Sequence, residues 1–350
     1  MASNYWESTQ RRYWQFSKDE LASIRQALED ADPNLVQSFP LPQQRHLNLY
    51  FNQQVNRLGK RLATRQQPLA TAQMYLKRFY LRVEIRRTNP YLFIATAVYL
   101  ACKMEECPQH IRVVVQEARS LWPTDFHGQD TSKLGECEFF LISEMNSQLI
   151  IHQPYRTLTN LQSDFELTQE EIMLAWTVIN DHYMTDLPLL YPPHTIALTA
   201  MLLAIVLRPP NTTGNGGGGN TPVTAAGVTG GLAMAASAFQ AQAQARAAAA
   251  AAAAMAANGG NSGPGTPQGS FSGFSPTTEA PGAEMKKAPD VRFAKAQRFA
   301  AWLAESNMDI EAMIDCAQEL ISFYECHEQY NEKLARDQIS RFIKARGLDK

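Results

Sequence analysis

The glycine spacing of residues 214–219 satisfies the G-x-G-x-x-G pattern that binds dinucleotide phosphates. That chemistry needs a strand before the glycines and a helix after them, whereas Pro209-Pro210 precedes them and Thr221-Pro222 follows. The seven histidines show no H-E-x-x-H spacing and the five cysteines form no C-x-x-C pair, so no zinc site is expected. No nucleophile elbow or Walker loop occurs. We therefore predict no catalytic residue, no metal and no cofactor.

Charged residues that could bind a protein partner stand at the end of an apolar run and within a later helical pattern. Lys103, Glu105 and Glu106 close the run that begins at Pro90, and Glu138 lies in the second helical pattern after it. Lysine supplies several hydrogen-bond donors and glutamate supplies acceptors, which suits binding to a polypeptide backbone. On pattern alone two simpler readings stay open: Lys103 stabilises a helix dipole, and the glutamates are ordinary solvated surface.

The composition limits the partners further. The chain has 350 residues, with 32 Lys+Arg against 34 Asp+Glu and a net charge of −2, which gives no general drive toward nucleic acid or anionic membranes. The cysteines lie in or beside apolar helical patterns, as free thiols of a reducing compartment do. The N-terminus has no apolar signal region, and the longest apolar runs are too short to span a bilayer. These features predict a soluble intracellular protein.

One segment differs from the rest of the chain. Fifteen of the 19 glycines lie between Pro209 and Pro289, together with an alanine run at Ala247–Ala254. Such a sequence has almost nothing to bury, so we predict a disordered low-complexity insert over residues 209–289.

The remaining sequence predicts helices throughout, in two successive sets of five. The first set is expected at Gln43–Thr64, Pro68–Glu84, Pro90–Met104, His110–Leu121 and Thr131–Asn146. The second set is expected at Pro154–Asp164, Thr168–Asp186, Pro192–Leu207, Val291–Ala304 and Asp309–His327.

The third helix of each set has the same opening, Pro-x-x-x-Ile-Ala, at Pro90 and at Pro192. Both helices are apolar on every side, so each must be surrounded by other helices. An internal repeat explains this match, although chance similarity of two core helices stays an alternative. We predict an all-α fold with a helical extension at 1–42, a first repeat at 43–153 and a second repeat in two parts. Those parts are 154–208 and 290–350, and the second ends in a C-terminal helix.

These residues resemble the cyclin family, and within it the cyclin C type. The string ACKMEE at Ala101–Glu106 is similar to the cyclin-box motif of a lysine followed by an acidic pair. The phrase Glu136–Leu158 is similar to transcriptional cyclins rather than cell-cycle cyclins. Three further segments are similar to cyclin C itself: Ser3–Gln10, Ala70–Arg82 and Asn180–Leu198.

The resemblance implies a fold of two five-helix cyclin-box repeats and a non-catalytic subunit that activates a cyclin-dependent kinase. The implied kinase is that of the Mediator complex, which regulates RNA polymerase II transcription. The resemblance therefore also implies other Mediator kinase-module subunits as partners and the nucleus as the location. Neither direct nucleic-acid binding nor membrane binding is implied. Residue by residue, the resemblance assigns kinase binding to Lys103, Glu138, Met104, Ile142, Leu149, Glu105 and Glu106.

The sequence leaves three questions undecided. Met104, Ile142 and Leu149 are equally typical of a core. The N-terminal aromatics, which include Trp6 and Trp14, are expected to dock either on a partner or on the body of the chain. The alternative function is a nucleic-acid binder with a cyclin fold, similar to a general transcription factor, although the basic face and zinc ribbon of that class are missing.

Overall fold

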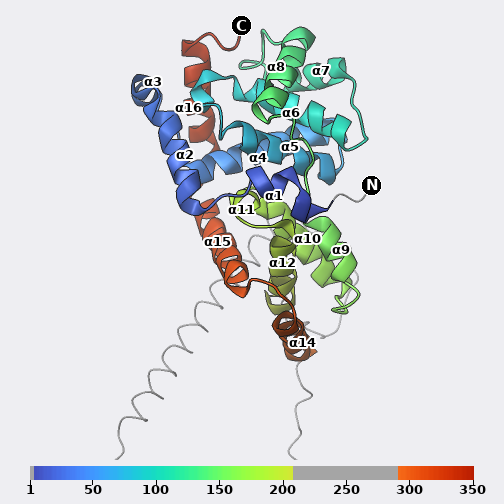
Figure 1. Cartoon of the computed structure of the whole chain (residues 1–350). Helices are drawn as coiled ribbons and strands as arrows, with labels where there is room; N and C mark the ends of the chain where they lie inside the picture. The colour runs from blue at the N-terminus through green and yellow to red at the C-terminus, as the bar shows by residue number, and fades with distance from the viewer. Residues whose placement is uncertain (1–3, 208–290) are drawn as a thin grey trace, which may run out of the picture. The chain divides into compact units, whose positions relative to one another are not determined.

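The computed structural model describes residues 4–207 and 291–350, and all regular structure in these two ranges is helical (Figure 1). The predicted all-α fold class is confirmed. The predicted disordered insert at 209–289 lies outside the described residues. Residues 4–207 and 298–350 belong to one compact unit, which contains both sets of helices except the first part of the helix that begins at Val291. No helix in the described ranges is long and apolar enough to cross a membrane.

The N-terminal extension is a series of short capped helices. They are η1 (Tyr5–Glu7), α1 (Thr9–Tyr13), α2 (Lys18–Asp30) and α3 (Pro33–Ser38). Ser17 and Glu20 form a capping box at the start of α2, and Asp32 caps α3 just before Pro33. These local signals start a new helix at Lys18 and again at Pro33, so the extension is a series of short helices and not one long helix.

The first predicted set of helices is present with shifts of a few residues. It comprises α4 (Gln44–Arg61), α5 (Gln66–Phe79), η2 (Ile85–Arg87), α6 (Pro90–Met104), α7 (Ile111–Leu121) and α8 (Thr131–Glu144). The expected helix Pro68–Glu84 ends at Phe79. Leu81 and Arg82 bond to the carbonyls three residues earlier, which tightens the chain into turns.

The second set is also present. It comprises α9 (Tyr155–Leu161), α10 (Gln169–His182), α11 (Leu187–Leu190), α12 (Pro193–Leu207), α14 (Val291–Glu305) and α15 (Ile310–Glu328). The predicted C-terminal helix is α16 (Glu332–Ala345). Phe299 of α14 is buried against Phe165, and Tyr324 of α15 bonds to α10 through its hydroxyl.

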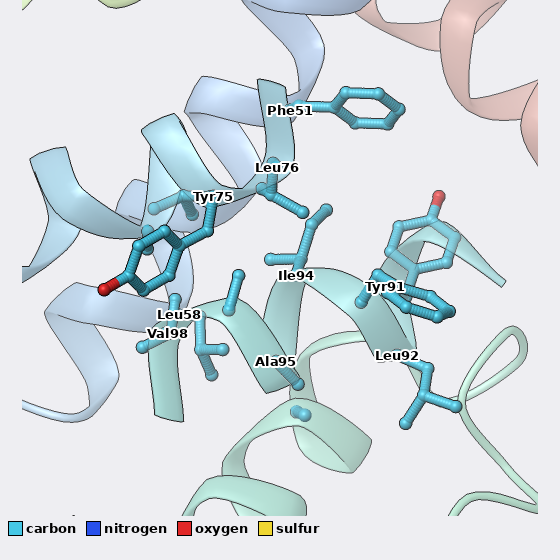
Figure 2. Packing of buried hydrophobic residues seen from close by; sticks show 14 of the residues in the cluster. Phe51, Leu58, Tyr75, Leu76, Tyr91, Leu92, Ile94, Ala95 and Val98 are labelled. Carbon is cyan, nitrogen blue, oxygen red and sulfur yellow. The ribbon is translucent and has the colours of Figure 1, made fainter. Parts of the chain in front are cut away.

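Helix α6 is the centre of the first set. It packs against α4, α5, α7 and α8, and nearly every side chain from Pro90 to Cys102 is buried. Figure 2 shows Ile94 and Val98 among Leu58, Tyr75 and Leu76 of the neighbouring helices. The fully buried alanines of α6 let those neighbours approach closely. Helix α12 has the same role in the second set, where it packs against α9, α10 and α15.

The N-terminal aromatics divide into a buried and an exposed group. Trp14 is 1% exposed and its indole Nε1 donates to Gln148 Oε1 at 2.5 Å. The guanidinium groups of Arg78 and Arg82 lie 5.0 and 5.5 Å from the centre of its ring. Trp6 and Tyr13, by contrast, are each 54% exposed. The N-terminal segment therefore docks on the body of the chain through Trp14.

Substituting Trp14 tests this docking. Trp14→Ala removes a buried ring, its hydrogen bond and two cation–π contacts, so we expect a loss of about 3–5 kcal/mol in the free energy of unfolding. Trp6→Ala removes the same side chain from an exposed site and should change stability by no more than about 0.5 kcal/mol. Urea titration followed by circular dichroism measures both. Equal effects of the two substitutions would contradict a structural role for Trp14.

A buried carboxyl group joins α10 to α15. Asp181 Oδ2 accepts a hydrogen bond of 2.9 Å from the hydroxyl of Tyr324. Burial raises the pKa of Asp181 to about 7, against 3.8 for an ordinary aspartate, and the Tyr324 bond offsets only part of that rise. Between these two values the folded chain holds a proton that the unfolded chain releases. The stability contributed by Asp181 is therefore present at acidic pH and lost as the pH rises toward 7.

Asp181→Asn should remove this pH dependence. As the pH rises from 5 to 8, the wild type should lose roughly 2–3 kcal/mol more unfolding free energy than the variant does. Denaturant titrations at several pH values measure the shift. Asp164→Asn, at an exposed position, is the control and should show no such trend. A constant difference for Asp181→Asn would show that Asp181 is ionised throughout.

Candidate functional site

Lys103 and Glu138, 35 residues apart in sequence, meet on the surface. Lys103 lies in the last turn of α6 and Glu138 in the middle of α8, and the packing of these helices brings the two side chains together. The Lys103 ammonium forms an ion pair with Glu138 Oε1. The Lys103 side chain is 40% exposed and that of Glu138 only 12%. The pair thus stands at the edge of the core, with the lysine reaching outward.

The lysine has a second contact on its own helix. Its Nζ lies 4.7 Å from the ring centre of Tyr99, one turn earlier on α6. An ammonium carries three donors, so an ion pair with one carboxylate leaves donors for a partner. The alternative role, in which the lysine stabilises the helix dipole, also fits the position of Lys103 in the last turn of α6. The two roles are compatible, since the dipole contact does not use the ammonium hydrogens.

The three predicted apolar residues differ in exposure. Met104 is exposed beside Lys103, whereas Ile142 and Leu149 are half-buried and pack against the hydrophobic core. Ile142 and Leu149 can therefore pack on the core and also contact a partner, because each side chain has one covered and one accessible part. Met104 is the most accessible of the three predicted apolar residues.

Two exposed hydrophobic side chains near the pair were not predicted from the sequence. Phe139 follows Glu138 and is 77% exposed, and Ile150 follows Leu149 and is 56% exposed. On α8, Phe139 shares a helix face with Ile142, three residues later. The adjacent Phe139-Phe140 was the available signal, since an amphipathic helix beside a core rarely buries both members of such a pair. We call Met104, Phe139, Ile142, Leu149 and Ile150 the apolar rim.

The turn that carries Leu149 is held by polar groups from α5. Asn146 and Ser147 both have left-handed backbone, with φ of 50° and 57°. Beyond them, Arg78 Nη1 donates to the Gln148 carbonyl at 2.7 Å and Tyr75 Oη donates to the Leu149 carbonyl at 2.7 Å. These bonds fix the backbone that presents Leu149 and Ile150.

The structure separates the predicted acidic pair. Glu105 is half-buried: its Oε1 accepts from Thr71 Oγ1 at 2.5 Å, and its Oε2 accepts from Gln67 Nε2 at 2.6 Å. Gln153 Nε2 adds a longer bond of 3.4 Å to Oε1. Glu106 is exposed, in left-handed backbone with φ of 54° just after the helix. Glu105 thus ties α6 to α5 and to Gln153, whereas Glu106 presents its carboxylate at the surface.

In the part of the chain that the structure describes, no group of three or more His, Cys, Asp or Glu side chains is placed to hold a metal ion. The predicted site residues do not form a nucleophile–base arrangement. What the arrangement offers chemically is a charged pair within an apolar rim, the pattern of a protein-binding surface with polar anchors.

Comparison with known proteins gives close relatives. Residues 43–150 match the family described as cyclin, N-terminal domain. The RNA polymerase II holoenzyme cyclin-like subunit of Chaetomium globosum is 66% identical over the whole of both chains. The protein with the same name from Neurospora crassa is 64% identical, also over the whole of both chains. A solved CAK complex from Chaetomium thermophilum is similar at 22% identity and a TM-score of 0.48, over 57% of this chain and 68% of that one.

The division of the acidic pair is testable by stability. Glu105→Ala leaves the Thr71 and Gln67 side chains without their acceptor, so we expect a loss of about 1–3 kcal/mol in the free energy of unfolding. Glu106→Ala removes an exposed carboxylate of the same size, and its effect should stay within about 0.5 kcal/mol. Thermal and urea denaturation measure both variants. A larger loss for Glu106→Ala than for Glu105→Ala would reverse the assignment.

Proposed function

Since the chain belongs to the cyclin family and is of the cyclin C type, we propose that it binds and activates a cyclin-dependent kinase through the Lys103–Glu138 pair and its apolar rim. One observation carries the proposal. The pair lies at the end of the buried helix α6, with an outward-reaching lysine and with exposed hydrophobic side chains beside it on α8 and on the turn after that helix.

The proposed mechanism needs no chemistry from this chain. A protein kinase is active when a glutamate on its mobile helix pairs with its phosphate-binding lysine. Lys103 would donate to backbone carbonyls of the kinase segment before that helix, and Glu138 would accept from backbone N–H groups there. The apolar rim would bury hydrophobic side chains of the kinase and exclude water from these bonds. Held in this way, the mobile helix stays in its active position.

The rigidity of the rim supports this role. Lys103 and Met104 end a helix that is buried on all sides, Ile142 packs on the core, and Leu149 lies in a hydrogen-bonded turn. A surface that is already in place loses little conformational entropy on binding. Glu106, exposed beside Met104, is suited to face a basic segment of the kinase, whereas Glu105 would act by supporting the end of α6.

The place of the complex is also a proposal. The relatives are named for the RNA polymerase II holoenzyme. We propose by extension that this chain and its kinase act in the nucleus on RNA polymerase II transcription, with the Mediator complex and its kinase-module subunits as partners.

A paired substitution tests the site. Lys103→Ala with Glu138→Ala removes both polar anchors, and truncation of buried charged partners at an interface costs about 2–5 kcal/mol. Binding to the kinase should therefore weaken at least tenfold and kinase activation should be lost. The kinase is identified by mass spectrometry after capture on the wild-type chain from a nuclear extract. Calorimetry and a phosphorylation assay with the purified kinase then measure the two effects.

The matched control is a second ion pair on the same repeat. Arg61 of α4 and Glu117 of α7 are 3.3 Å apart on the surface, on helices that contribute no residue to the apolar rim. Arg61→Ala with Glu117→Ala should leave binding and activation unchanged. If the Lys103 and Glu138 variant remains helical by circular dichroism and activates the kinase normally, the site assignment is wrong. Capture of DNA instead of a kinase by the wild-type chain would favour the nucleic-acid alternative.

A further inference from the structure

The segment between α8 and α9, residues 148–153, contains no regular secondary structure, yet it carries two residues of the apolar rim. Leu149 and Ile151 pack against the hydrophobic core, whereas Ile150 between them is 56% exposed. This alternation is that of an extended chain, in which successive side chains point to opposite sides. Since no helix or sheet holds the backbone here, other groups must hold it if Ile150 is to stay in one place.

Side chains from two other parts of the chain hold this backbone. Hydrogen bonds from α5 to the carbonyls of Gln148 and Leu149 hold its first end. At the other end, the side chain of Gln10 in α1 forms two bonds to His152. Its Oε1 accepts from the His152 N–H at 2.7 Å, and its Nε2 donates to the His152 carbonyl at 3.3 Å. Ile150 therefore lies between backbone contacts from α5 and backbone contacts from the N-terminal segment.

Gln10 is itself fixed in the position from which it makes these bonds. It is 5% exposed, and beside it the rings of Tyr5 and His152 pack edge to face with centres 5.6 Å apart. Further along the same segment, the Phe16 N–H donates to the carbonyl of Leu189 at 2.8 Å, in the second set of helices. Both polar atoms of the Gln10 side chain thus bind a backbone 142 residues away in sequence, and neither takes part in capping α1.

We propose that Gln10 is a positioning residue for kinase binding, which holds the His152 end of the segment so that Leu149 and Ile150 are in place before the kinase binds. The inference rests on the proposed function, and it adds a residue that acts on the apolar rim without belonging to it. A rim segment that is free at one end has to be ordered on binding, and the entropy of that ordering is subtracted from the affinity. The N-terminal extension thereby affects the affinity for the kinase without contacting it.

Gln10→Met tests this role, because it keeps the length of the buried side chain and removes both hydrogen bonds. In the free full chain, hydrogen exchange of the Ile151 and His152 amides should become roughly tenfold faster, while exchange at Lys103 and Met104 stays unchanged. The affinity for the purified kinase, measured by calorimetry, should fall roughly five- to tenfold, since the segment must then be ordered on binding.

Double-mutant cycles separate positioning of the rim from a general structural effect. In a chain that carries Leu149→Ala and Ile150→Ala, the segment has no rim side chain left to position. Adding Gln10→Met to that chain should therefore change the kinase affinity by no more than about twofold. In a chain that carries Lys103→Ala, on the rigid end of α6, the loss caused by Gln10→Met should be as large as in the wild type, because the two sites act independently.

The matched control is Gln53→Met on α4, a helix that contributes no residue to the apolar rim. Gln53 Oε1 accepts from Tyr330 Oη at 3.0 Å, and the loss of this bond should leave kinase affinity unchanged. Wild-type affinity of the Gln10→Met chain would overturn the inference and leave the proposed function in place, whereas a wild-type chain that binds no kinase would overturn both. A full loss of affinity on adding Gln10→Met to the Leu149→Ala, Ile150→Ala chain would indicate direct contact with the kinase and overturn the positioning role.

Discussion

The burial of two helices that are apolar on every side is the constraint on which the rest of the structure depends. Helix α6 carries Ile94, Val98 and fully buried alanines, so no face of it can be left to water. Its four neighbours exist in this arrangement because each must cover one side of it. Helix α12 imposes the same requirement on the second set. A fold built in this way is rigid at the centre, and its two central helices can present side chains to a partner only at their ends.

The candidate kinase-binding site depends on that arrangement. A central helix can reach the surface only at its ends, and α6 does so at Lys103 and Met104. Glu138 reaches the same place because α8 packs on α6, and Leu149 lies on a turn that Arg78 and Tyr75 hold from α5. The N-terminal segment adds to the same turn through Trp14 and Gln148. The surface offered to a partner is thus fixed from several elements at once.

Polar groups between helices have two different roles in this chain. Glu105 accepts hydrogen bonds from Thr71 and Gln67, so its charge is used to join helices. Gln73 and Lys77 stand in a comparable crevice, yet the described residues provide neither with a direct partner. The first arrangement is complete within the chain and explains stability. The second is incomplete within the described chain.

The sequence by itself determined the all-α class, the approximate bounds of the helices and the two central helices, because periodicity, prolines and caps act over a few residues. Through the resemblance to cyclins it also predicted kinase binding by Lys103 and Glu138. It could not decide which of Glu105 and Glu106 is used internally, since Thr71 and Gln67 lie on another helix. Nor could it show that the buried amide of Gln73 has no hydrogen-bond partner among the described residues. Burial and pairing across helices are properties of the packed chain, and only the tertiary structure decides them.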